Sequence, residues 1–373
     1  MRARFLLLLP FLWTLHSSAY AQDKQEEDRA IAEIEKRGGK VLRNEDLPGK
    51  PVVSVNLDNV KDGDACLKQI SIWPGLQGLH ISYSTVTDAG LKNVQNLNAL
   101  THLFIHGVPM TNEGLMNLKG LTELRQLTIG HTKISDAGLA SLTELTKIEE
   151  LYFFEPALTG AALEHLKKMT KLRRLVLAET QTTNAALNNL QGFADLQELI
   201  LIDTPVSDGG LKHLKKLPAL HMLGLTAVNL SDAGIADLKQ LENLKVLVLS
   251  ASKEGEGGAA LGRARKIPFV PGLILQLGFS GATDADLASL KDVANLAGLA
   301  LAEPKITDAG LVHLKSITSL HSLDLSFTAV TDEGMKQLHG LENLKSLKLR
   351  QTKVTDEGKR ALRKALPKLV IGP

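Results

Sequence analysis

The chain has 373 residues, of which 44% are apolar and 23% are charged, so it is long enough for a large core and ordinary in composition. Its formal net charge is only +2. A nearly neutral chain exerts little long-range attraction on a polyanion, so we expect no nucleic-acid partner.

Residues 1–21 differ from the rest of the chain. Arg2 and Arg4 precede an apolar run over residues 5–15, and the small-residue pattern Ala19-Tyr20-Ala21 follows. This order is typical of a secretory signal peptide cleaved before Gln22. The run is short for a membrane span, and no later stretch approaches the roughly 20 apolar residues that a span needs. We therefore expect an exported protein, periplasmic or secreted, with no stable membrane insertion after cleavage.

The next segment, residues 22–52, is charged and helical in character, and Gly38-Gly39 ends the helical pattern. We interpret it as an amino-terminal helical cap that covers the first coil of the domain over residues 53–373. Cys66 is the single cysteine, so it cannot form an internal disulfide, and we expect a small buried residue there.

The main domain is built on a repeat. Leu79-His80-Ile81 recurs every 24 residues up to Leu223-Gly224-Leu225, and related triplets extend the series to thirteen, from Val55-Asn56-Leu57 to Leu347-Lys348-Leu349. The alternation within each triplet predicts a short strand with its leucines inward. Such a period predicts stacked coils that share one core.

A second signature follows each strand. Eight residues after the first leucine stands Thr or Ser, as at Thr87, Thr111 and Thr331, usually followed by Asp. The hydroxyl is suited to cap a helix, and the carboxylate is suited to the positive end of its dipole. Each coil is therefore predicted to contain a strand, a turn, a capped helix and a return.

These patterns predict an α/β leucine-rich-repeat solenoid of about thirteen coils. We expect a curved horseshoe with a parallel sheet on the concave face and helices on the convex face. The sequence L-x-L-x-x-T-x-V-T-D-x-G at Leu323–Gly334 and Leu347–Gly358 resembles bacterial exported leucine-rich-repeat proteins, and the spacing is similar to the cysteine-containing repeats of F-box-associated and ribonuclease-inhibitor-like proteins. The chain lacks the repeated cysteine of the latter, which argues against a ubiquitin-ligase adaptor.

The period breaks once, between Leu247 and Leu275, where the step is 28 residues. We interpret residues 247–275 as an irregular coil that tolerates an insertion, with a loop that contacts a partner as the alternative.

The outward strand positions predict a partner-binding strip, because they carry apolar and aromatic residues on neighbouring coils. The strip consists of Phe104, Tyr152, Phe154, Val176, Ile200, Ile202, Met222 and Val248. The alternative is that these residue types simply suit strands.

Two polar sets are weaker candidates. Glu155, Glu179 and Asp203 occupy one position in successive coils and predict a solvated acidic edge, with a calcium-like site as the alternative. His80, His102 and His106 lie on neighbouring strands, but no serine or cysteine nucleophile can be placed beside them. We therefore predict no catalytic residue, no metal site and no cofactor.

The function that the sequence favours is a non-catalytic binding scaffold that contacts a protein partner through its concave face. The alternatives are an envelope component that binds polysaccharide, with sugar stacked on Tyr152 or Phe104, and an enzyme. The enzyme is disfavoured because the sequence shows no Gly-rich phosphate loop, H-E-x-x-H zinc motif or G-x-S-x-G elbow.

Overall fold

The computed structural model describes residues 24–155, 157–227, 230–251, 273–279, 281–293 and 295–372. The predicted signal peptide lies outside these residues, and so do residues 252–272 of the irregular coil. The chain forms two compact units, Met1–Ile148 and Glu149–Pro373.

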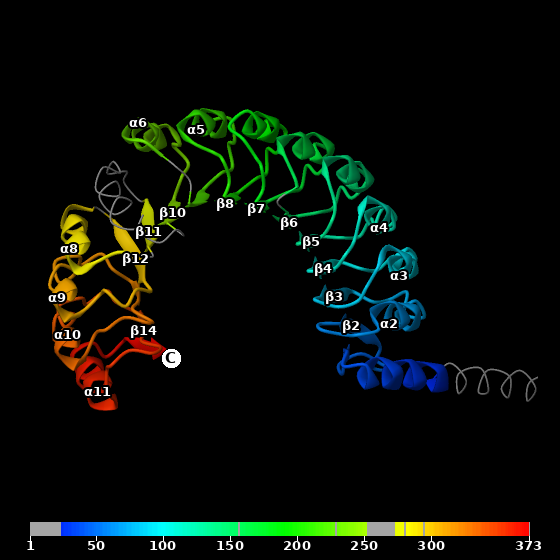
Figure 1. Ribbon diagram of the computed structural model, residues 1–373, viewed down its shortest axis with the longest axis horizontal. Coiled ribbons are helices and arrows are strands. Elements are labelled where there is room, and N and C mark those ends of the chain that lie inside the picture. Colours follow the sequence, from blue (N-terminus) through cyan, green and yellow to red (C-terminus); the bar gives the residue numbers. More distant parts are fainter. Residues whose placement is uncertain are drawn as a thin grey trace, which may run out of the picture. The chain divides into compact units, whose positions relative to one another are not determined.

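The first unit begins with a helix over residues 24–36 and continues as strands alternating with short helices (Figure 1). Its strands are β1 (Lys40–Arg43), β2 (Val52–Asn56), β3 (Gly78–Ser82), β4 (His102–His106) and β5 (Gln126–Gly130). Its helices are α2 (Gly63–Ile70), α3 (Asp88–Leu91), η1 (Lys92–Val94), α4 (Asn112–Met116) and η2 (Asp136–Leu142).

The second unit repeats the same alternation. Its strands are β6 (Glu150–Phe154), β7 (Arg174–Ala178), β8 (Glu198–Ile202), β9 (Met222–Thr226), β10 (Val246–Ala251), β11 (Ile274–Phe279), β12 (Leu296–Leu301), β13 (Ser322–Asp324), β14 (Ser346–Lys348) and β15 (Val370–Gly372). Its helices are η3 (Gly160–Leu166), η4 (Ala186–Gly192), α5 (Asp208–Leu214), α6 (Asp232–Asp237), η5 (Leu238–Gln240), α8 (Asp284–Leu287), η6 (Ala288–Asp292), α9 (Asp308–Leu311), α10 (Asp332–Lys336) and α11 (Asp356–Ala365).

Within each unit the strands neighbour one another in chain order. They pair in parallel, except that β1 pairs antiparallel with β2. The helices lie on the opposite side of the coils from the strands (Figure 1). Strands β2 to β14 are the thirteen predicted strands, so the solenoid prediction is confirmed.

The core lies between the strands and the helices. Leu79 and Leu103 stand opposite each other in the ladder, and each is 2% exposed. Leu175 and Leu199, paired in the second unit, are 0% exposed. Burial of such side chains contributes roughly 1.5–3 kcal/mol each. The inward placement of these leucines is therefore as predicted.

The 28-residue step does not interrupt the strand ladder. Val246 pairs with Ile274 and Leu247 with Leu275, in the register of the regular coils. The extra length therefore enters the coil outside the strands, where longer connections cost little free energy.

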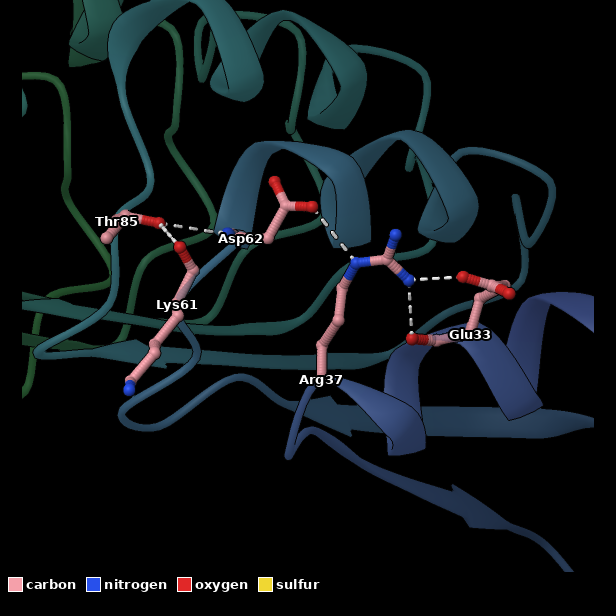
Figure 2. A network of polar contacts seen from close by, with 6 residues as sticks. Glu33, Arg37, Lys61, Asp62 and Thr85 are labelled. Carbon is pink, nitrogen blue, oxygen red and sulfur yellow. Dashed lines mark hydrogen bonds and ion pairs between the residues drawn. The ribbon is translucent and has the colours of Figure 1, made fainter.

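The segment before the first coil is tied down by an arginine (Figure 2). Arg37 follows the helix over residues 24–36, and its Nε donates to Asp62 at 3.1 Å while its guanidinium also binds the Glu33 carboxylate. Thr85, in the next coil, donates to the Lys61 carbonyl at 2.5 Å. Lys61 and Asp62 are adjacent in the chain. Through these two residues the first coil contacts both the helix over residues 24–36 and the second coil.

Buried groups lie under this segment. Ala30 and Ile34 of the helix are 1% and 0% exposed, and Cys66 is 0% exposed, as predicted. Burial raises the pKa of the Cys66 thiol. The helix therefore covers the apolar end of the first coil, as a terminal element of a repeat protein must.

Successive coils are joined on the helix side by a repeated side-chain contact that the sequence did not predict. The Asp at the start of one helix reaches the next coil, where its carboxylate accepts from both the backbone amide and the hydroxyl of Thr or Ser. The amide donor lies 2.7–3.0 Å from its acceptor in all eight pairs. The pairs are Asp64–Thr87, Asp88–Thr111, Asn112–Ser135, Asn184–Ser207, Asp208–Ser231, Asp284–Thr307, Asp308–Thr331 and Asp332–Thr355.

Asparagine takes the place of aspartate in two of these pairs. The Asn112 and Asn184 side-chain oxygens accept from the backbone amide, while their NH2 groups donate to the serine hydroxyl at 2.9 and 2.8 Å. The contact therefore needs the shape of the side chain and two hydrogen bonds, not a charge.

The glycine of the T-D-x-G signature makes room for this contact. A Cβ atom at Gly334 would overlap with Asp308 Oδ1 and lie 2.9 Å from Leu311 Cδ1. Gly90, Gly114, Gly310 and Gly358 meet the aspartate of the preceding coil in the same way. The Thr, Asp and Gly that recur in the signature therefore all serve this contact. Thr donates to the aspartate of the preceding coil, Asp accepts from the Thr of the next coil, and Gly leaves room for the aspartate side chain.

The predicted helix capping is confirmed in part. Thr111, Thr159 and Thr331 accept a hydrogen bond from the amide two residues on. Thr87, Ser135 and Ser207 make no side-chain cap. The hydroxyl of Thr87 donates to Asp64 only, whereas those of Thr111 and Thr331 donate to the preceding coil and accept the cap at the same time, so the two contacts are compatible. The helices themselves are short, and η2, η3 and η4 are 3-10 helices.

We predict that Gly334→Ala destabilises the protein by about 1–3 kcal/mol, because the methyl group overlaps with Asp308 in a packed position. Gly340→Ala, in the same coil, is the matched control, since a Cβ atom there meets nothing within 4 Å. Free energies of unfolding from urea titration, followed by circular dichroism, measure both variants. Equal stability of the two variants would contradict the spacing role of Gly334.

We predict that Asp332 makes the stability acid-sensitive. The hydroxyl and amide hydrogen bonds from Thr355 lower the pKa of Asp332 from its ordinary 3.8. A folded-state pKa below the unfolded value stabilises the protein above about pH 4, and this contribution is lost as the pH falls through the folded pKa. Asp332→Asn preserves the geometry seen at Asn112 but does not titrate.

The measurement is the difference in unfolding free energy between the wild type and Asp332→Asn, from pH 7 down to pH 3. The expected difference favours the wild type near neutrality and shrinks with acid. A difference that stays constant over this range would show that Asp332 titrates alike in the folded and unfolded chains.

Candidate binding surfaces on the strand side

The strands present every second side chain away from the core, and in the second unit these side chains are mainly apolar. Phe154, Ile200, Ile202, Met222 and Val248 are half-buried, whereas the leucines between them are buried. Ile200, Ile202, Met222 and Val248 lie on β8, β9 and β10, which are hydrogen-bonded in register, so their side chains stand about 4.8 Å apart on adjacent strands. Phe154 lies on β6, and the buried Ala178 of β7 stands between it and Ile202. The strand side of this unit therefore carries a continuous, partly uncovered apolar surface.

One predicted member of the strip is less exposed than its outward position indicates. Val176 is only 5% exposed, although its position faces away from the core. Tyr152 and Ile200 lie directly beside it on the neighbouring strands, and both side chains are larger. The alternation predicts orientation correctly, but the neighbours cover the smaller side chain.

A glycine shapes the middle of the apolar surface. Gly224 lies between Ile200 and Val248 in the strand register. A Cβ atom at Gly224 would lie 3.1 Å from Ile200 Cγ2, tighter than ordinary van der Waals contact. Because Gly224 has no side chain, the apolar surface is recessed at this position, between Ile200 and Val248 on the two neighbouring strands.

Polar side chains lie at one edge of the apolar surface, near the first residues of β6, β7 and β8. We call Glu150, Tyr152, Arg174 and Glu198 the polar row. Arg174 pairs with Glu198 at 2.6 Å and contacts the Tyr152 hydroxyl at 3.5 Å, and that hydroxyl donates to Glu150 at 2.6 Å. The hydrogen bond from Arg174 opposes the effect of burial and Glu150, which together raise the pKa of the Tyr152 phenol. Hydrogen bonding to Glu198 raises the pKa of Arg174. The row fixes the Tyr152 ring and holds Arg174 as a cation.

Phe104, the remaining member of the predicted strip, lies in the first unit and has different neighbours. Its ring stacks on His80 with centroids 4.0 Å apart and lies 5.9 Å from the His106 ring. His106 in turn packs edge-on against Tyr83 at 5.3 Å and His131 at 4.7 Å. The five rings form a continuous cluster on the strand side of the first unit.

The repeat pattern did not predict that Tyr83 and His131 belong to the same ring cluster as Phe104. Both stand two residues beyond the L-x-L triplet, in the turn after the strand, where the backbone has a positive φ of 47° and 49°. The triplet pattern predicts no direction for a side chain in such a turn. The available signal was the shared position of Tyr83, Gly107 and His131 in successive coils.

The three histidines proposed as weak candidates have polar partners of their own. His80 Nε2 lies 3.1 Å from Asp58 Oδ1, and His102 Nδ1 lies 2.8 Å from Thr101 Oγ1. The Tyr83 hydroxyl lies 3.1 Å from His106 Nε2. Among the described residues, no group of three or more His, Cys, Asp or Glu side chains is arranged to hold a metal ion.

The acidic edge differs from its prediction. Glu155 is 0% exposed, so it is not part of a solvated edge. Glu179 and Asp203 are exposed and lie in positive-φ turns, at 56° and 48°. No positive φ is found at Glu155, so its coil leaves the strand differently and turns the carboxylate inward.

Comparison with known proteins concerns the repeat and the fold. A family model described as a leucine-rich repeat matches residues 316–338. No curated protein matches the sequence. No helix within the described ranges has the length and apolar character needed to cross a bilayer.

Several solved structures are similar at low identity. A chain of the yeast Rad7–Elc1 complex is 17% identical, with 99% of this chain and 98% of that chain covered at a TM-score of 0.50. An internalin, InlF, from Listeria monocytogenes is 21% identical, with 87% and 90% covered at a TM-score of 0.47. A leucine-rich-repeat protein from Leptospira interrogans is 16% identical, with 82% and 80% covered at 0.40.

At these identities, similarity concerns the fold and not the partner. The 24-residue period, the parallel strands with helices on their other side and the matched repeat agree with one another. The chain therefore folds as a leucine-rich-repeat solenoid, and residues 316–338 match a leucine-rich-repeat model.

Proposed function

We propose that the chain is an exported, non-catalytic scaffold that binds a protein partner through the strand side of its second unit. One observation carries this proposal: Phe154, Ile200, Ile202, Met222 and Val248 stay partly exposed above a core of buried leucines. Covering such surface contributes about 25 cal/mol per Å² of apolar area. A partner gains this free energy where the chain itself leaves the surface uncovered.

The polar border supports a protein partner in particular. Interfaces between proteins commonly place apolar and aromatic residues at the centre and polar residues at the rim, and arginine and tyrosine often dominate the binding energy. Tyr152 and Arg174 are held in place by Glu150 and Glu198 before any partner arrives. Side chains that are already ordered lose less entropy on binding.

Export and the lack of catalysis remain proposals. Export rests on the signal-peptide pattern of residues 1–21. The non-catalytic role rests on the absence from the sequence of the nucleophile, phosphate-loop and zinc motifs. The rigid stack of coils suits a scaffold, because its surface is formed without a partner.

The test compares capture of proteins from an extract of the cell envelope of the source organism. The double variant Phe154→Ser/Ile202→Ser replaces two apolar side chains of the surface. Val312→Ser is the matched control, because Val312 is an exposed apolar residue at the end of helix α9, 40% exposed. We expect a protein that the wild type and the control enrich at least about tenfold over the double variant.

Circular dichroism checks that all three proteins are folded. If the folded double variant captures the same proteins in the same amounts as the wild type, this surface does not bind the partner.

A further inference from the structure

The strand side of the first unit contains a pocket of about 240 Å³. It is lined by residues of β2 to β5: Ser54, Gly78, Leu79, His80, His102, Leu103, Phe104, Gln126 and Thr128. Gly78 shares its register position with His102 and Gln126 on the next strands. The pocket exists because Gly78 places no side chain where the following coils have large ones.

The lining is polar, and none of its side chains carries a permanent charge. Ser54, His80, His102, Gln126 and Thr128 supply hydroxyl, imidazole and amide groups, and Phe104 supplies an aromatic ring. The lining contains no Asp, Glu, Lys or Arg among the described residues. The pocket therefore offers hydrogen bonds and one ring, but no counter-charge for an ionic ligand.

Hydrogen bonds around the two imidazoles determine what they offer a ligand. Thr101 Oγ1 donates its hydrogen to the Gln77 carbonyl at 3.0 Å, so His102 Nδ1 is the donor to Thr101 and Nε2 is the acceptor of the neutral ring. His80 Nε2 donates to the Asp58 carboxylate at 3.1 Å, which leaves Nδ1 as its acceptor. Asp58 also binds Ser82 and Asn56, so His80 is held in orientation.

Beyond Phe104 the ring cluster extends the site. Tyr83 is 64% exposed, and its hydroxyl contacts His106 at 3.1 Å. A Cβ atom at Gly107 would lie 2.6 Å from the Tyr83 ring, so the ring lies across the backbone of a glycine. Phe104 and Tyr83 are separated by the His106 ring, at 5.9 and 5.3 Å. A second, exposed aromatic ring thus stands near the pocket.

We propose that this pocket binds one ring of an uncharged oligosaccharide, with Phe104 at the pocket and Tyr83 contacting a neighbouring sugar. A pyranose ring carries hydroxyl groups around its edge, which donate to imidazole and amide acceptors, and C–H groups on its faces, which pack on aromatic rings. The volume is below the roughly 300–1,000 Å³ of pockets that enclose drug-sized ligands, and suits a single sugar. This site is separate from the apolar surface proposed to bind a protein.

The lining disfavours the other ligand classes. A phosphate or carboxylate has no hydrogen to donate to the two imidazole acceptors and would lose its hydration without a cation in exchange. An apolar anchor of a protein partner would bury hydroxyl and amide groups without hydrogen bonds, which is unfavourable. Sugar hydroxyls satisfy these groups.

The test fills the pocket. Gly78→Gln introduces the side chain that Gln126 carries at the same register position, and the three atoms nearest to a Cβ at Gly78 all belong to Ser54, at 2.9, 3.4 and 3.9 Å. Ser322→Gln is the matched control, because Ser322 is exposed at the corresponding strand position of the second unit. Phe104→Leu removes the ring and keeps an apolar side chain.

The probes are chitohexaose, cellohexaose and maltohexaose as neutral oligosaccharides and a hyaluronan hexasaccharide as the anionic one. Binding is measured by saturation-transfer NMR and titration. We expect at least one neutral probe to bind the wild type and Ser322→Gln equally, and both Gly78→Gln and Phe104→Leu to weaken that binding by about tenfold or more. The double variant Phe154→Ser/Ile202→Ser should bind the sugar like the wild type, whatever it does to protein capture.

Three results would overturn the proposal. They are binding of none of the neutral probes, binding of hyaluronan alone, and unchanged binding by a folded Gly78→Gln variant. If Gly78→Gln abolishes sugar binding but Phe104→Leu leaves it unchanged, the Phe104 ring does not contact the sugar.

Discussion

The structure depends on the contact by which an aspartate or asparagine of one coil accepts from the backbone amide and binds the hydroxyl of a Thr or Ser in the next. It spans 23 residues in each of the eight pairs, so it holds only if consecutive coils have nearly the same length and pitch. The strand ladder fixes the opposite side of each coil. With both sides fixed and the leucines buried between them, the outward strand residues are the part of the repeat left free to vary.

The sequence predicted the strands and the core because both depend on spacing along the chain. The positions of β2 to β14 and the burial of Leu79 and Leu103 follow from the 24-residue period and from alternation. The role of the aspartates did not follow, because a contact across 23 residues becomes visible only when coils are stacked. The same hydroxyl can donate to the preceding coil and accept a cap, and the sequence alone does not show that Thr87 makes only the first of these contacts.

The candidate sites were predicted less completely, for a different physical reason. Alternation gives the direction of a side chain but not how much its neighbours cover it, so Val176 was expected to be exposed and is buried beside Tyr152 and Ile200. It also gives no direction in the turns after the strands. Tyr83 lies in such a turn, and Glu155 is buried where Glu179 and Asp203 are exposed.

The turn after the strand has a positive φ in coils of both units, at Tyr83 and His131 in the first and at Glu179 and Asp203 in the second. Its left-handed backbone suits glycine or asparagine, which occur there as Gly107 and Asn59. A tyrosine at φ 47° costs free energy, and Tyr83 recovers little of it by burial, since it is 64% exposed. Phe327 lies in a comparable turn of the second unit, is 43% exposed, and has the Arg350 guanidinium 5.8 Å from its ring centroid. The Tyr83 ring contacts His106 and lies across the backbone of Gly107, so its position is set by these two contacts and not by burial.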